Sequence, residues 1–141
     1  MNLETSNSNT SLDLPKDQGT LAIDLGNSTT VVAFQGEEDK NIRLLDLFPI
    51  SRIPGEVPSL VWHSNDNPPY TAVGNEISKL DLNKDKEQYL MSDFKRWICA
   101  PKESRQQSIN LSPEKAGEIL IQAIWQHIPH QLQIKRLVLT A

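Results

Sequence analysis

Residues 21–34 place a carboxylate, a glycine and a run of short polar side chains between two apolar runs. In chain order these are Asp24, Gly26, Asn27, Ser28, Thr29 and Thr30. Glycine allows the backbone angles of a tight reversal, where successive backbone N–H groups converge on an anion and nearby hydroxyls add further donors. The pattern therefore predicts a hairpin whose turn binds phosphate.

Asp24 stands at the end of the first apolar run, directly before the predicted turn. A carboxylate beside bound phosphates repels them unless a divalent cation lies between, and Mg²⁺, which usually keeps several waters, suits one such carboxylate. Asp24 is thus the candidate magnesium ligand. The alternative interpretation is an ordinary Gly-Asn turn between core strands, with its hydroxyls in solvent and Asp24 capping the turn.

A second candidate group lies much later in the chain, where Lys95 and Arg96 interrupt the apolar positions of segment 94–98. Ser92 can cap a turn of helix there. An ammonium is a compact charge that offsets negative charge during phosphoryl transfer. The alternatives are a surface lysine whose stem covers Trp97 and an arginine in a structural ion pair.

Composition limits the classes of protein to which this chain can belong. The chain has 141 residues, 38% of them hydrophobic, and a formal charge of −4, which fits one acidic domain at most. Without a basic stripe, nucleic acid is not an expected partner. Residues 1–19 lack the apolar core of a signal peptide or membrane span and predict a disordered tail. With a single cysteine, Cys99, expected to act as a small hydrophobe, we expect a cytoplasmic protein without a membrane partner.

The elements that position these groups follow from the apolar patterning. Three sequential strands are predicted at 21–23, 31–34 and 41–48. Proline and glycine then break the pattern, so residues 50–111 predict an inserted α+β lobe. Within this lobe we expect a hairpin of segments 59–63 and 70–73, followed by a short helix over 75–80.

The last part of the chain predicts a helix followed by a strand. Ser112-Pro113-Glu114 is a helix start, and Pro129 ends the helix. Residues 137–141 form a continuous apolar run typical of a central strand in a helix-covered sheet. The apolar stripe of the helix consists of Ala116, Ile119, Leu120, Ala123, Ile124 and Ile128.

Taken in order, these segments resemble the DnaK-type (70-kDa heat-shock) chaperone family, whose ATPase domain opens with a similar Asp-Leu-Gly hairpin. Later segments agree in the same order over roughly residues 20–141, and ordered agreement of several short motifs is more specific than any one. The matching segments are Val57-Pro58-Ser59-Leu60-Val61-Trp62, Val73-Gly74-Asn75-Glu76, Phe94-Lys95-Arg96-Trp97-Ile98 and the strand from Ile134 to Ala141.

The resemblance implies an α/β fold: a partial ribonuclease-H-like sheet of the actin-like ATPase type, with residues 20–141 as an incomplete first lobe. It implies ATP or ADP and Mg²⁺ as ligands. The backbone of residues 26–28 and the hydroxyls of Thr29 and Thr30 would then hold phosphates. Lys95 matches the family's catalytic lysine, which reaches toward the terminal phosphate and the attacking water.

The sequence also departs from the family's pattern. After Gly26 the family has Thr-Thr-Asn-Ser, whereas this chain has Asn27-Ser28-Thr29-Thr30, which exchanges the first hydroxyl for an amide. Cys99 stands where the family commonly has glycine. The second glycine-rich hairpin, the adenosine-binding residues, the remaining carboxylates near the metal and the peptide-binding domain have no counterpart.

We therefore expect an amino-terminal fragment of an ATP-dependent chaperone. ATP hydrolysis, protein folding, client proteins and co-chaperones would belong to the complete protein. Two alternatives stay open. One is a fragment of a small-molecule kinase of the sugar or acetate type, which uses a similar Asp-x-Gly hairpin. The other is a noncatalytic interaction module whose exposed sheet edge docks a partner chain.

Overall fold

The computed structural model describes residues 17–82, 87–101, 103 and 111–141, and these form a mixed α/β fold made mostly of strands. A five-stranded sheet runs in the order β3-β2-β1-β8, and β4 also pairs with β2. β1 is antiparallel to β2 and parallel to β8. The strands are β1 (Asp17–Asp24), β2 (Thr29–Gly36), β3 (Ile42–Leu44), β4 (Glu56–Pro58) and β8 (Leu132–Thr140).

Buried and exposed residues alternate along the two central strands, β1 and β2. Leu21 and Ile23 of β1 and Val32 and Phe34 of β2 are buried in the main core, while their neighbours in sequence are more exposed. β1 begins at Asp17, so the last three residues of the predicted tail belong to the sheet. The rest of that tail lies outside the described residues.

The third strand is shorter than the sequence predicts. β3 ends at Leu44. The Leu45 N–H still donates to the Val32 carbonyl of β2 at 3.1 Å, and both Leu45 and Leu47 are buried in the core. β3 is short because it shares one edge of β2 with β4. β4 pairs with the first residues of β2 and β3 with the last. The Val32 N–H donates to the Gly55 carbonyl at 2.9 Å, which closes the gap between them.

A second sheet of three strands has the order β6-β5-β7. The predicted hairpin and the short helix after it are confirmed, although each is trimmed at its ends. Trp62, Ala72, Ile77 and Tyr89 form a small separate core. The elements are β5 (Val61–His63), β6 (Thr71–Val73), α2 (Glu76–Lys79), η2 (Glu87–Tyr89), β7 (Leu90–Met91) and η3 (Phe94–Trp97).

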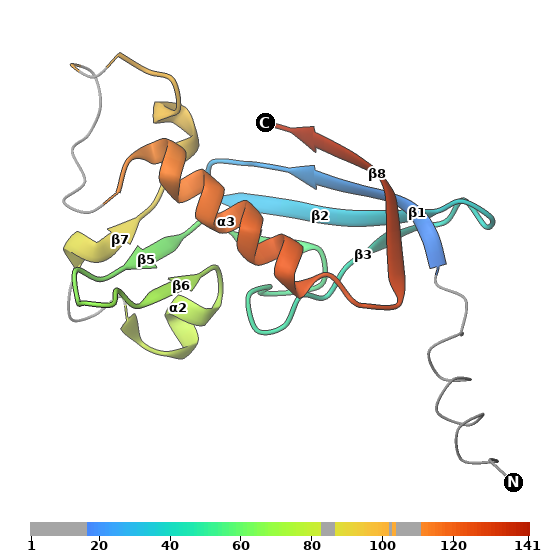
Figure 1. Cartoon of the computed structure of the whole chain (residues 1–141), viewed down its shortest axis with the longest axis horizontal. Helices are drawn as coiled ribbons and strands as arrows, with labels where there is room; N and C mark the ends of the chain where they lie inside the picture. Colours follow the sequence, from blue (N-terminus) through green and yellow to red (C-terminus); the bar gives the residue numbers. More distant parts are fainter. Residues whose placement is uncertain (1–16, 83–86, 102, 104–110) are drawn as a thin grey trace, which may run out of the picture.

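The helix predicted from its start signal is α3 (Pro113–His127), which crosses one face of the five-stranded sheet in Figure 1. The Ser112 hydroxyl accepts from the Lys115 N–H at 3.1 Å, as an N-cap should. Ala116, Leu120 and Ile124 are fully buried against the sheet. Among the described residues, no helix is both long and apolar enough to cross a membrane.

The last strand differs from its prediction in extent and in surroundings. β8 begins at Leu132, earlier than the apolar run indicates, and pairs only with β1 among the described strands. Its apolar residues Leu137, Val138 and Leu139 are 41% to 54% exposed. Within the described structure β8 is an edge strand, and the second neighbour that a central strand would have is not among the described strands.

Candidate functional site

The turn between β1 and β2 carries a row of backbone donors. Within the part of the chain that the structure describes, the N–H groups of Gly26, Asn27 and Ser28 have no hydrogen-bond partner. The side chains of Asn27 and Ser28 are exposed. Consecutive backbone N–H groups at a turn can bind one anion together, as the sequence pattern predicts.

Position 26 requires a glycine because there is no room for a Cβ atom, and not because of its backbone angles. Its φ lies outside the left-handed region, so the reason given by the sequence pattern does not apply. A Cβ at this position would lie 2.2 Å from the Thr29 carbonyl oxygen, closer than real Cβ atoms approach. The turn therefore depends on the backbone of Gly26 lying directly against that of Thr29.

Ser59, which follows β4, holds the turn in place. Its hydroxyl donates to the Gly26 carbonyl at 2.8 Å, and its N–H donates to the Ser28 carbonyl at 2.9 Å. The Thr30 hydroxyl lies 2.8 Å from the Ser59 hydroxyl, and both side chains are buried. Thr30 thus faces into the fold and supports the turn, whereas Thr29 is half-buried at the start of β2.

A Ser59→Ala substitution is expected to destabilise the protein by about 1–3 kcal/mol, because it leaves the Gly26 carbonyl and the Thr30 hydroxyl without their partner. Urea unfolding measures this loss. Ser78→Ala, at an exposed position of α2, is the matched control and should change stability by less than about 0.5 kcal/mol. Equal effects of the two substitutions would show that the Ser59 hydroxyl does not hold the turn.

Asp24 ends β1 with an exposed carboxylate, and its neighbour across the sheet orients it. The Thr140 hydroxyl, from the last residue of β8, donates to Asp24 Oδ1 at 2.7 Å. The Leu25 N–H donates to the Thr140 carbonyl at 2.8 Å, which fixes the two strand ends together. No group of three potential metal ligands occurs among the described residues, so Asp24 fits only an ion that keeps most of its own waters.

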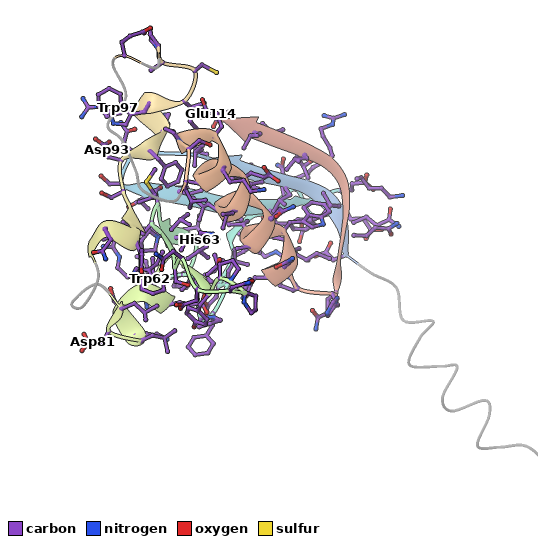
Figure 2. All side chains as sticks on the ribbon, turned by 60° about the vertical axis from the view of Figure 1, so that its left-hand side comes forward. Trp62, His63, Asp81, Asp93, Trp97 and Glu114 are labelled. Carbon is purple, nitrogen blue, oxygen red and sulfur yellow. The ribbon has the colours of Figure 1, made fainter. Side chains whose placement is uncertain are left out.

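Lys95 belongs to η3, which lies at the same end of the sheet as the β1–β2 turn. Figure 2 labels Asp93 and Trp97, which flank Lys95 in sequence, and Glu114 at the start of α3, and all three lie near that end. η3 packs against the first turns of α3, where Phe94 and Ile98 contact the open side of Gly117. η3, which carries Lys95, and the hairpin are far apart in sequence but lie at one end of the molecule.

The start of η3 differs from the sequence prediction. Asp93, not Ser92, precedes the helical turn, and it has a left-handed backbone with φ of 54°. Its carboxylate accepts from Arg96 at 2.9 Å, so Arg96 forms a structural ion pair, the alternative that the sequence left open. Lys95 itself is half-buried.

The residue after η3 and its C-cap also departs from prediction. Cys99 is exposed and not a buried hydrophobe, and its φ of 63° lies in the left-handed region that favours glycine. Its N–H donates to Glu114 Oε1 at 3.2 Å, which ties this turn to the start of α3.

No protein-family model matches the chain, and no curated protein matches it. Sequence reasoning missed Ser59 and Thr140 as supports of the site, because each acts through a contact between segments distant in the chain.

Proposed function

We propose that this chain is the amino-terminal part of an actin-like, DnaK-type nucleotide-binding domain and that its β1–β2 turn binds the phosphates of ATP. The observation that carries the proposal is the row of N–H groups at residues 26–28, which have no partner among the described residues, beside the exposed Asp24 carboxylate. The strand order β3-β2-β1-β8, with a helix before β8, supports a ribonuclease-H-like sheet. The left-handed backbone of Cys99, where the family has glycine, adds to this.

Each group of residues has its own role in the proposed site. The N–H groups of Gly26, Asn27 and Ser28 bind phosphate oxygens, and Ser59 and Thr30 keep them aligned from below. Asp24, oriented by Thr140, holds a hydrated magnesium ion. That ion, when bound, offsets the charge of the phosphates. Lys95 adds a second positive charge near the terminal phosphate. In the complete protein this arrangement serves ATP hydrolysis and chaperone action in the cytoplasm.

Isothermal titration of the full chain with ATP tests the proposal. We expect weak binding that requires Mg²⁺, because ligand affinity depends on groups converging from all sides of a site and the described residues line only one side of it. Lys95→Met should weaken binding about threefold, the effect of one partly solvated charge. Lys135→Met, an exposed lysine of β8, is the matched control and should leave binding unchanged.

Two results would contradict the proposal. The absence of any binding heat at millimolar MgATP would remove nucleotide binding from this chain. Equal affinities for the Lys95→Met and Lys135→Met variants would show that Lys95 does not reach the phosphates.

A further inference from the structure

β8 leaves one long edge of the five-stranded sheet open within the described structure. Among the described strands it pairs only with β1, and Figure 1 shows it at the margin of the sheet. The Thr140 carbonyl accepts from the Leu25 N–H, so the main-chain groups of Thr140 point toward β1. Because these groups alternate in direction along a strand, those of Leu137 and Leu139 point away from the sheet. No other described element pairs with them there.

The second half of this edge lacks the features that commonly prevent strands from pairing between molecules. Such features are charged side chains, proline and bulges. In β8 the break in its register with β1 and the two cations, Lys135 and Arg136, all come before Leu137. From Leu137 to Thr140 the strand is regular, uncharged and free of proline. This stretch can therefore accept a further strand.

The same stretch is apolar on both faces of the sheet. Leu137 lies beside the buried Leu21 on the face that carries α3, and Leu139 follows on that face. Val138 lies beside Ala22 on the opposite face. The three exposed side chains of β8 are 41% to 54% accessible. Apolar residues on both sides are typical of a strand that has a neighbour on each edge, so pairing of this edge would bury them further.

We propose that two copies of this chain pair their β8 strands antiparallel, across a two-fold axis at Val138, so that their sheets join into one. In this register Leu137 of each copy forms a hydrogen-bonded pair with Leu139 of the other, and the two Val138 side chains lie opposite each other. One surface thus serves both copies, as a two-fold symmetric interface requires. The contact needs no nucleotide and goes beyond the proposed function.

Charge favours this register over its neighbours. It places Arg136 opposite the uncharged Thr140 of the second copy, on the face where Asp24 lies beside Thr140. The cation of one copy and the carboxylate of the other are then one strand apart and complementary. An axis at Leu137 would instead place a cation opposite Leu139. An axis at Arg136 would place two cations directly opposite each other, which is unfavourable.

Sedimentation equilibrium of the full chain, without nucleotide, tests the proposal. We expect a dimer of twice 15.9 kDa with a dissociation constant on the order of 10–100 µM, because a pair of edge strands makes a small interface. Leu139→Lys places a cation opposite Leu137 twice in each dimer and should weaken dimerisation about tenfold. Ile42→Lys is the matched control, since Ile42 is a 72% exposed apolar residue of another edge strand, β3. It should leave the dimer unchanged.

Cysteine cross-linking tests the register. Opposite residues of a non-hydrogen-bonded pair have Cα atoms about 4.5 Å apart, a distance that a disulfide can span. In a Cys99→Ser background, Val138→Cys should therefore give a disulfide-linked dimer when oxidised glutathione is added. Arg136→Cys, on the same face of β8, is the control. Its two Cα atoms would lie about 13 Å apart along the strands, so it should not cross-link.

Three results would overturn the proposal. A chain that stays monomeric at about 1 mM, well above the expected dissociation constant, would leave the β8 edge to a different partner. A dimer that Leu139→Lys weakens no more than Ile42→Lys would be held together by another surface. Equal cross-linking of the Val138→Cys and Arg136→Cys variants would show that the strands do not pair in this register.

Discussion

A Gly26→Ala variant is expected to lose about 1–3 kcal/mol of unfolding free energy and to lose measurable binding of MgATP. The added Cβ would lie 2.2 Å from the Thr29 carbonyl oxygen, so the backbone of the turn must move. Thr29 cannot yield freely, because it begins β2 and pairs with Pro58 of β4. The movement would shift the N–H groups of residues 26–28 out of alignment, so binding should fall further than stability alone explains. Urea unfolding and calorimetric titration measure the two losses separately.

Gly36→Ala at the other end of β2 is the matched control. A Cβ there would meet Asp39 Oδ1 at 2.8 Å and Asp17 Oδ1 at 3.3 Å, and both are side-chain ends that can rotate away once Asp39 Oδ1 gives up its exposed hydrogen bond from the Asn41 N–H. Its stability should therefore stay within about 1 kcal/mol of the parent, with ATP binding retained. A Gly26→Ala protein that binds MgATP as the parent does would remove the turn from the proposed site.

The sequence predicted well those parts of the fold that depend on residues within or beside the element itself. The start of α3 depends on Ser112 and Pro113, and its end on Pro129, all within or beside the helix. The buried side of α3 follows from helical spacing alone. The short hairpin of β5 and β6 was likewise marked by the polar turn between its strands.

The parts that the sequence could not predict depend on partners elsewhere in the chain. The length of β3 is set by β4, which pairs with the other half of β2. The exposure of β8 follows from its position at the edge of the sheet, which its apolar sequence does not reveal. In the candidate site, the role of Thr30 changes from a surface donor to a buried support because Ser59 lies beneath the turn.

The expected role of Asp24 can be separated from a purely structural one. An Asp24→Asn substitution keeps an oxygen that accepts from the Thr140 hydroxyl but removes the negative charge that would hold the metal. We expect the substitution to abolish the Mg²⁺-dependent part of ATP binding, with a loss of about tenfold or more in affinity and little change in stability. Titrations with and without Mg²⁺ measure this, and Asp66→Asn, in the loop between β5 and β6, is the control.

Thr140 should act only through Asp24. Thr140→Val removes the hydroxyl that donates to Asp24 Oδ1 but keeps the backbone carbonyl that accepts from Leu25, so a loss of about threefold to tenfold in affinity is expected. Thr140→Ser restores a hydroxyl and should restore binding. In the Asp24→Asn background, Thr140→Val should add no further loss, because coupled residues are not additive. A full additional loss in that background would mean that Thr140 contacts the nucleotide or shapes the turn independently, and that the carboxylate does not depend on it for its orientation.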